Sequence, residues 1–372
     1  MKPTMQGRLA LSVVSLGLGL GLAQQSINAQ EMPGWEKALY EAAKKEKEFT
    51  VYTAHYSTQG AANLCAAFDK KYPGVKCNFV RTTAQVAYQR YQQELKANKP
   101  VVSVLSSTDV GHYPPLKAQG QLMAYKPNNL GNMVDALKVY NDPDGHWLVT
   151  SAGLVVITYN NSLVAEKDAP KKWTDLLDPK WKEKLAIGHP AFSGYVGTWV
   201  VAMDKTYGWS YFDRLEKNRP QIGRSINDTV TMLNAKERWV AAGPDATTLQ
   251  SQDKGNPVSV IYPEDGSLLM VSMTGIPKNA PSPNAAKLFI EFLLSKEAAE
   301  VQVKDRAQSV IKGVRPLPGG KAMDEIKLLR PSEDEIAKGI PAVKEKFRDT
   351  FGISMPSAHR RCVLLKAQTA PS

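Results

Sequence analysis

The amino-acid sequence predicts an α/β protein whose chain is woven into two lobes. Three observations support this fold class. The composition is close to the globular average, with 43% hydrophobic and 22% charged side chains among 372 residues. Strand-like and helix-like patterns alternate along the chain, and no internal repeat or low-complexity linker divides it. A disordered or fibrous protein is therefore excluded, and one or two domains with real cores are expected.

The chain opens with a segment typical of a secretory signal peptide. Residues 1–29 begin with Lys2 and Arg8 and continue into an apolar run of about fifteen residues that reaches Ala23. This run is short for a membrane span, and no second apolar span follows it. We expect cleavage after Ala23 or Ala29, and a mature protein that is exported to the periplasm and acts as a monomer.

The region after this segment alternates strands and helices in a regular order. Strand-like runs occur at residues 49–55, 75–81 and 101–105, and helical patterns occur at residues 57–72 and 84–97. Repeated βα units of this length predict a parallel sheet covered by helices.

The second half of the chain continues the alternation. The apolar run at residues 154–159 predicts a buried strand that is suited to cross between two lobes. Two further strands are expected at residues 185–189 and 258–262. Helices are expected at residues 195–217, 228–237, 284–300 and 332–350.

Three cysteines are too few for a disulfide-stapled scaffold. Cys65 lies in a helical pattern and Cys77 in a strand pattern, and both are expected to face the same core. Disulfides are permitted in an exported protein, so a disulfide and a pair of buried free thiols both remain open. Cys362 lies near the C-terminus and has no expected partner.

The formal net charge is +11, and its distribution matters more than its size. Two units belong to the predicted signal peptide. Three belong to residues 354–372, a basic tail with Arg360, Arg361 and Lys366 that we expect to be flexible. The remaining charge of +6 is scattered over the body, which is typical of a solvated surface. Nucleic acid is therefore not expected as a partner.

Polar residues collect where predicted strands end and helices begin. Five such junctions, rich in hydroxyl and amide side chains, lie at residues 55–60, 81–83, 106–109, 188–194 and 225–229. Ligands bind at this edge of an open α/β sheet, and helix N-termini with nearby hydroxyls attract anions. Ordinary helix capping explains any single junction. Their recurrence in both halves of the chain favours a ligand site.

Arg81 is the most specific candidate, because a guanidinium at a strand end can bind a carboxylate or phosphate with two hydrogen bonds. A surface charge is the ordinary alternative. Tyr56 and Tyr262 are suited to stack on a ligand, and Glu264 and Asp265 to accept hydrogen bonds from it, although packing and a turn also explain them. The candidate ligand-binding residues are Tyr56, Ser57, Arg81, Thr82, Thr83, Ser107, His189, Ser193, Gly194, Asp228, Thr229, Tyr262 and Glu264.

Catalytic signatures are missing from the sequence. It has no G-x-S-x-G elbow, no H-E-x-x-H helix, no C-x-x-C pair and no phosphate-binding G-x-x-x-x-G-K-[ST] loop. The five histidines are scattered without metal-ligand spacing. His189 and Ser193 are the nearest approach to a base and a nucleophile. We expect neither an enzyme, nor a bound metal, nor a cofactor.

Several sequence blocks resemble the periplasmic solute-binding proteins of ABC importers. These blocks are FTVYTAHYSTQG (49–60), VVITYNN (155–161), WTDLLDPKWKEKLAI (173–187), ERWVAAG (237–243) and the long block from Tyr262 to Val301. The resemblance is to extracellular family 1, the group that binds ferric iron, thiamine, sugar phosphates or phosphonates.

This resemblance implies a type II periplasmic-binding-protein fold, with two α/β lobes joined by crossing hinge strands and a ligand cleft between them. Lobe 1 would contain residues 30–154 and 263–300, and lobe 2 residues 155–262 and 301–353. The closed, loaded form would dock on a membrane permease that is served by a cytoplasmic ATPase.

The resemblance also bears on the ligand. Ferric binders of this group place two adjacent tyrosines after the stretch that corresponds to residues 241–243. Here residues 244–248 contain no tyrosine, and a hard Fe(III) site needs anionic oxygen ligands. We therefore expect a small organic anion with a phosphate, phosphonate or carboxylate group. Ferric iron, thiamine and an exported enzyme on the same fold remain the alternatives, and a role in sensing is also open. The residues expected to hold the anionic group are Ser57, Thr82, Thr83, Ser193, Gly194 and Thr229.

Overall fold

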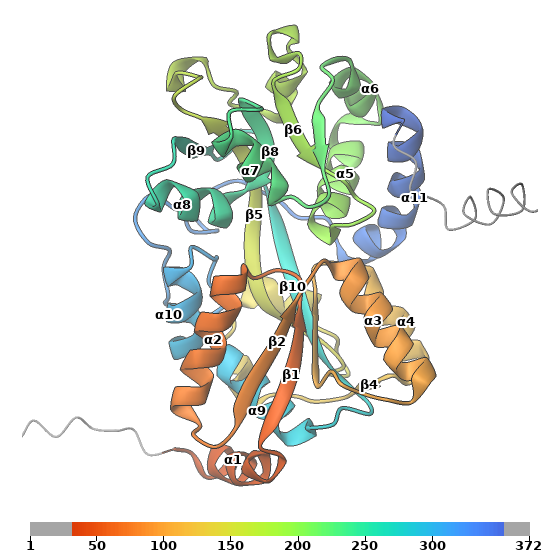
Figure 1. The fold of residues 1–372 in the computed structure, drawn as a ribbon, viewed down its shortest axis with the longest axis vertical. Helices are drawn as coiled ribbons and strands as arrows, with labels where there is room; N and C mark the ends of the chain where they lie inside the picture. Colours follow the sequence, from red (N-terminus) through yellow and green to blue (C-terminus); the bar gives the residue numbers. More distant parts are fainter. Residues whose placement is uncertain (1–31, 353–372) are drawn as a thin grey trace, which may run out of the picture.

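The computed structural model describes residues 32–352. The predicted signal peptide, the predicted tail and Cys362 lie outside the described residues. The described chain forms two lobes, one above the other in Figure 1, that share one continuous sheet. The strand order across this sheet is β2 (Lys76–Arg81), β1 (Glu48–Thr53), β3 (Val104–Ser107), β10 (Ser267–Pro277), β5 (Leu148–Asn160), β8 (Val240–Pro244), β6 (Leu185–Gly188) and β7 (Gln221–Gly223). The first lobe lies below and contains residues 34–123 and 283–304; the second lies above and contains residues 185–261 and 333–351. The predicted α/β class is confirmed.

The first lobe is built around three parallel strands. Strand β1 (Glu48–Thr53) pairs with β2 (Lys76–Arg81) on one side and with β3 (Val104–Ser107) on the other. The remaining elements of this lobe are α1 (Gly34–Glu46), α2 (Thr58–Lys71), α3 (Ala84–Ala97), α4 (Tyr113–Ala118), β4 (Leu122–Met123), α9 (Pro283–Leu293) and α10 (Lys296–Lys304).

Aromatic packing holds these helices on the sheet. The ring of Phe68 from α2 lies 5.3 Å from Phe49 of β1 and 5.4 Å from Phe289 of α9, centroid to centroid. Phe68 is fully buried, so truncating it would cost about 3–5 kcal/mol. Cys65 of α2 and Cys77 of β2 form a disulfide, which decides between the two alternatives that the sequence left open.

The second lobe repeats this plan. Strand β6 (Leu185–Gly188) runs parallel to β7 (Gln221–Gly223) and to β8 (Val240–Pro244). The other elements are α5 (Gly194–Tyr207), α6 (Ser210–Lys217), α7 (Asp228–Asn234), α8 (Asp245–Asp253), β9 (Val258–Ile261) and α11 (Glu333–Phe351). Short 3₁₀ turns across both lobes and their connections cover Val110–His112, Asn128–Asn132, Asp135–Tyr140, Glu166–Asp168, Trp173–Leu177 and Pro179–Trp181.

Two long antiparallel strands carry the chain between the lobes, as Figure 1 shows. They are β5 (Leu148–Asn160) and β10 (Ser267–Pro277), and every residue of both is buried. Strand β10 was missed in the sequence, because Ser272, Thr274 and Gly275 interrupt its apolar run. Such residues are tolerated here because both faces of the sheet are covered, and strands of this kind carry no polar-apolar alternation.

Two predicted helices are each divided in two. The expected helix 195–217 breaks at Gly208, whose φ of +73° is available to glycine at little cost. The expected helix 284–300 breaks at Ser295, whose hydroxyl accepts a hydrogen bond from the backbone N–H of Ala298 and so starts α10.

A third passage between the lobes follows α10. Its residues contact elements of both halves of the molecule: the backbone N–H groups of Lys312 and Gln308 bond to the carbonyls of Asn132 and of Ala152 in β5, whereas Arg306 pairs with Asp253 of α8. The chain then pairs β11 (Leu328–Leu329) with the start of β10 and enters α11. Across residues 32–352, no helix combines the length and the hydropathy that a membrane span requires.

Candidate ligand-binding site

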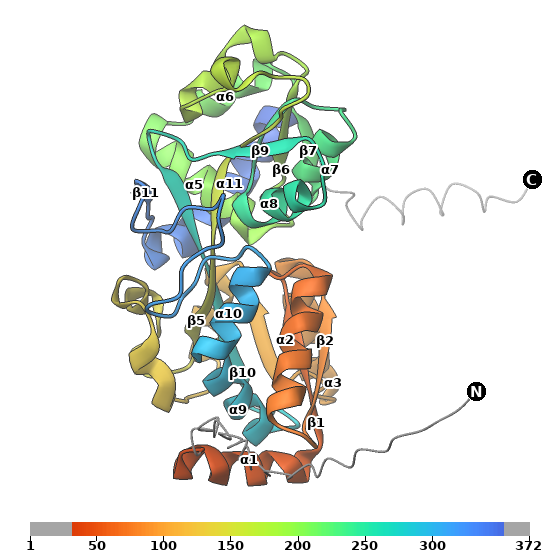
Figure 2. The same ribbon diagram turned by 90° about the vertical axis from the view of Figure 1, so that its left-hand side faces the viewer.

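A cavity of about 80 Å³ lies between the two lobes, beside the crossing strands. Helices α2 and α3 begin beneath it and helices α5, α7 and α8 begin above it (Figures 1 and 2). The polar and charged side chains among its lining residues are His55, Tyr56, Ser57, Arg81, Thr83, Thr108, Ser151, Ser193, Tyr195, Ser225, Asn227, Asp245, Thr247, Gln250, Gln302 and Asp305.

Four helices of eight residues or more direct their N-termini at this cavity. Ser57 caps α2 by accepting a 3.0 Å hydrogen bond from the backbone N–H of Gly60, and Ser193 caps α5 in the same manner. Thr83 precedes α3 but makes no cap bond, and Pro244 precedes α8. The unpaired N–H groups of a first helical turn and the helix dipole both favour a bound anion.

Arg81 ends strand β2 at the floor of the cavity. Its Nε donates a 3.0 Å hydrogen bond to the carbonyl of Tyr56, which holds the guanidinium in place. Burial lowers the pKa of Arg81, and the nearby Asp228 carboxylate opposes that shift; the group stays cationic at neutral pH. Within residues 32–352 no carboxylate lies within ion-pair distance of Arg81, so its charge is free to meet a ligand.

His55 and Tyr56 end strand β1 beside Arg81. Nδ1 of His55 lies 3.2 Å from the hydroxyl of Ser106, whereas its Nε2 is buried without a partner in the described chain. Burial and the charge of Arg81 lower the pKa of His55 to about 3, so the imidazole is neutral at pH 7. The Tyr56 hydroxyl is likewise buried without a partner there, and burial raises its pKa above the ordinary value.

Two acidic side chains that line the cavity were missed in the sequence. Asp245, the first residue of α8, accepts hydrogen bonds from the backbone of Leu154 at 3.0 Å and from the amide of Gln308 at 3.0 Å. Burial raises its pKa to about 6. Asp305 follows α10, and its carboxylate accepts bonds of 3.0 and 3.2 Å from Asn63. Asp245 lies at the junction of a strand and the helix that follows it, so the search for polar residues at such junctions could have found it. No sequence signal marks Asp305.

Five of the candidate residues named from the sequence line the cavity. They are Tyr56, Ser57, Arg81, Thr83 and Ser193.

The other eight lie outside the cavity lining, and three of them serve the turns in which they occur. Thr82 donates its backbone N–H to Thr53 within the strand pairing. The Ser107 hydroxyl is buried 2.9 Å from His112 Nδ1. Asp228 accepts two hydrogen bonds from Ser225.

Two further candidates lie in the interior of the second lobe, and a third contacts the first lobe. His189 accepts a 3.0 Å hydrogen bond from Ala191, and its ring packs against Phe347, so it is a core histidine. Thr229 is fully buried and donates its hydroxyl to the Ile226 carbonyl at 2.7 Å. Gly194 packs on the backbone of Thr108 from the first lobe.

The remaining two lie after β9. The hydroxyl of Tyr262 accepts a hydrogen bond from the backbone of Lys321, and Glu264 is exposed opposite Lys172. Asp265, which was considered beside them, is held by Tyr207 at 2.6 Å and by the backbone of Trp173.

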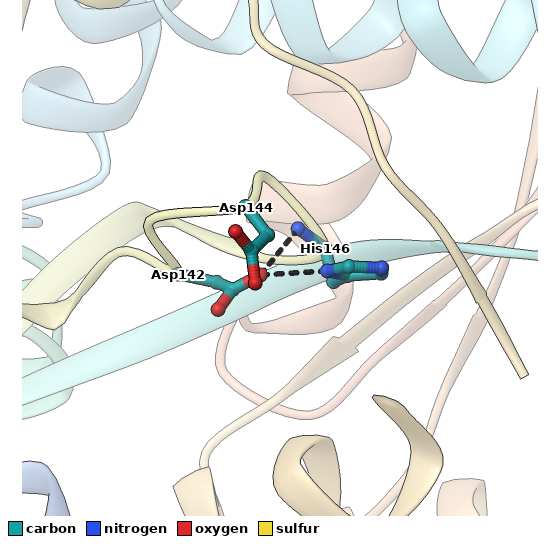
Figure 3. Close-up of side chains that lie close together, drawn as sticks. All are labelled: Asp142, Asp144 and His146. Carbon is teal, nitrogen blue, oxygen red and sulfur yellow. Dashed lines mark hydrogen bonds and ion pairs between the residues drawn. The ribbon is translucent and has the colours of Figure 1, made fainter. Parts of the chain in front are cut away.

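A second polar cluster lies in the turn before β5, away from the cavity. Figure 3 shows Asp142, Asp144 and His146, whose ligand atoms all lie within 4.8 Å of one another. His146 Nδ1 is 2.7 Å from Asp142, and Lys117 forms ion pairs of 2.6 Å with both aspartates. Because a lysine ammonium already neutralises these carboxylates, the cluster stabilises the turn.

Comparisons with known proteins agree with this architecture. The family model of bacterial extracellular solute-binding proteins matches residues 99–338, more than half of the chain. A putative 2-aminoethylphosphonate-binding periplasmic protein of Salmonella typhimurium is 31% identical over 151 residues, which is 38% of this chain and 44% of that protein. The chain thus spans less than half the length of that relative.

Two further relatives are matched over most of their length. Iron uptake protein A1 of Synechocystis is 26% identical over 326 residues, covering 81% of this chain and 86% of that protein. The structure of the periplasmic binding protein AfuA from Actinobacillus pleuropneumoniae, with bound fructose-6-phosphate, superposes with a TM-score of 0.73 at 21% identity, covering 83% of this chain and 100% of that one. The predicted type II fold and the predicted family are both confirmed: the chain belongs to the bacterial extracellular solute-binding proteins, the periplasmic components of ABC importers.

Proposed function

We propose that this protein captures a small organic anion in the periplasm and delivers it to the permease of an ABC importer, which a cytoplasmic ATPase drives. The anionic group of the solute is a phosphate, phosphonate or carboxylate. The protein binds its solute without chemical change, and no residue acts catalytically.

The guanidinium of Arg81 carries this proposal. It is half-buried at the cavity floor, it is held by Tyr56, and within the described chain it has no ion-pair partner. A buried cation without a counter-ion is costly, and an oxyanion would relieve that cost through two charge-assisted hydrogen bonds. The N-termini of α2 and α3 and the buried Nε2 of His55 supply further donors to the same anion.

Contacts between the lobes support a closed, ligand-ready form. Gly194 at the start of α5 meets the backbone of Thr108, and Lys344 of α11 lies 3.9 Å from Asp109. On the opposite side of the cavity, Arg306 forms an ion pair with Asp253 of α8. Binding of the solute between the lobes would favour this arrangement, and the permease would recognise it.

The anion site is tested by the Arg81→Gln variant, with Arg219→Gln as the matched control. Arg219 is exposed and pairs with Glu183 on the surface of the second lobe. A thermal-shift screen with phosphorylated sugars, phosphonates and carboxylates identifies a stabilising anion, and calorimetry measures its affinity. We expect Arg81→Gln to weaken binding by at least about 10-fold, whereas the control binds normally. The absence of stabilisation by every anion would refute the proposal.

Ferric iron is the second candidate, because the cavity also contains the phenols of Tyr56 and Tyr195 and one relative is the iron uptake protein A1 of Synechocystis. Burial raises the pKa of both phenols, which opposes the phenolate form that iron needs. Arg81 would also repel a trivalent cation. Titration with a ferric salt should therefore give no tyrosinate-to-iron absorption band, and a strong visible band would replace the anion proposal with the iron one.

A further inference from the structure

The charges of the cavity do not match a purely anionic solute. Arg81 is its one permanent cation among the described lining residues, and His55 is neutral, whereas Asp245 and Asp305 both supply carboxylates. A solute with negative charge alone would satisfy Arg81 but would be repelled by two acidic groups in a medium that screens them poorly. A positive group on the same solute would remove this conflict.

Asp305 is the carboxylate that can accept further hydrogen bonds. It follows the last residue of α10, and its partner in the described chain is the neutral amide of Asn63, which donates to both oxygens. Burial raises the pKa of Asp305, and no neighbouring cation opposes the shift. Each carboxylate oxygen can accept two hydrogen bonds, so this group can still accept bonds from a charged donor.

Gln302 lies one helical turn before Asp305 and lines the same cavity. Its side chain is only 2% exposed, yet both of its amide atoms lack a hydrogen-bond partner among residues 32–352. Buried polar groups are normally paired, and those left unpaired in a native structure call for an explanation. An ammonium group carries three N–H donors, enough to reach the Gln302 carbonyl oxygen and the Asp305 carboxylate together.

These groups come from other elements than Arg81. Helices α10 and α8 lie on the left in Figure 1, and α3 lies on the right. Gln250 of α8 donates to the backbone carbonyl of Asp305, which places Asp305 beneath α8. Arg81 ends β2, just before α3. The cavity therefore receives its cation from the end of β2 and a carboxylate from the end of α10.

We infer that the solute carries an ammonium group as well as its oxyanion, and that Asp305 and Gln302 bind this ammonium while Arg81 binds the oxyanion. The inference rests on the proposed function, because it assigns the second half of the same solute. The substrate class is a short zwitterion in which a few carbon atoms separate an amine from a phosphonate, phosphate or carboxylate. Asp245 contributes negative charge to the same cavity, while its own hydrogen bonds hold Leu154 and Gln308.

Pairs of compounds that differ only in the amine test this inference. Calorimetry compares 2-aminoethylphosphonate with ethylphosphonate, and β-alanine with propionate, on the full mature chain. In at least one pair we expect the amine to improve affinity by about 10- to 100-fold, the range for hydrogen bonds to a charged group. Equal affinities within each pair would overturn the inference and leave the anion proposal standing. Failure of all four compounds to bind would overturn the inference, whereas the anion proposal falls only if no anion of the thermal-shift screen stabilises the protein.

The Asp305→Asn variant provides the second arm, and Glu300→Gln is its matched control. Glu300 lies on α10 and is exposed. Its substitution by glutamine removes one negative charge, as Asp305→Asn does. Asp305→Asn should abolish the preference for the amine while binding the amine-free compound at least as well as the wild type. The control should keep the full preference. If Asp305→Asn weakens both members of a pair equally while its melting temperature is unchanged, Asp305 does not contact the amine and the inference fails.

Discussion

Replacing Gly194 by alanine should impair closure of the lobes without unfolding either of them. An added Cβ would lie 2.2 Å from the carbonyl oxygen of Thr108 and 2.6 Å from the backbone nitrogen of Asp109, both in the first lobe. Real Cβ atoms stay beyond 3.0 Å, so the lobes would have to separate by at least about 0.8 Å at this point.

The size of the effect follows from the atoms that clash. They belong to backbone, which cannot rotate away, so the closed form should lose about 1–3 kcal/mol, the usual cost of overpacking. Apparent affinity falls with the population of the closed state. We therefore expect solute binding to weaken by about 5- to 150-fold.

Gly197→Ala is the matched control, one turn further along α5. Its Cβ would meet the side chain of Ile340 at 3.0 Å, within the second lobe, where a rotamer change gives relief. Calorimetry with the anion that stabilises the wild type measures the affinity of each variant, and thermal unfolding without ligand measures stability. Wild-type affinity in Gly194→Ala, or equal losses in the two variants, would refute the assignment of this contact to closure.

Two further predictions concern stability. Burial raises the pKa of Asp245 to about 6, so between about pH 4 and 6 the folded state binds more protons than the unfolded state, and the free energy of unfolding falls as the pH rises. In urea unfolding, the wild type should lose up to about 3 kcal/mol across this window relative to Asp245→Asn. Parallel pH profiles of the two proteins would contradict this prediction. The Cys65–Cys77 disulfide closes a loop with a sequence separation of 12 residues, so the Cys65→Ser, Cys77→Ser double variant should be destabilised by about 2–3 kcal/mol in urea, and a reducing agent should then affect only the wild type.

Some of the site could be predicted because it obeys a local rule. Tyr56, Ser57, Arg81, Thr83 and Ser193 each lie between a strand and the helix that follows it, and the carboxyl ends of parallel strands meet at one edge of a sheet. The same rule also selected Thr229 and His189. Their side chains turn into the lobe interior, where Thr229 bonds the Ile226 carbonyl and His189 packs on Phe347. Which way a junction residue points depends on neighbours that are distant in sequence.

The positions of Asp305 and Gln302 in the cavity follow no local rule. Asp305 and Gln302 lie at the C-terminal end of a helix, where polar residues normally face solvent. They line the cavity because α10 packs beside α2 and beneath α8, as Figure 2 shows, and Gln250 reaches across to the backbone of Asp305. The third passage of the chain between the lobes is of the same kind, since residues 310–312 pair with residues 132–134.

By itself, the sequence determined the α/β class, the family and the strand-end arginine. Each of these depends on patterns of neighbouring residues: hydrophobic periodicity, capping residues and contiguous blocks. The tertiary structure alone decided that Cys65 and Cys77 are joined, that β10 is a crossing strand, and that two carboxylates share a cavity with Arg81. Those outcomes depend on contacts between segments more than a hundred residues apart, or on which face of an element is buried, and a one-dimensional pattern does not contain that information.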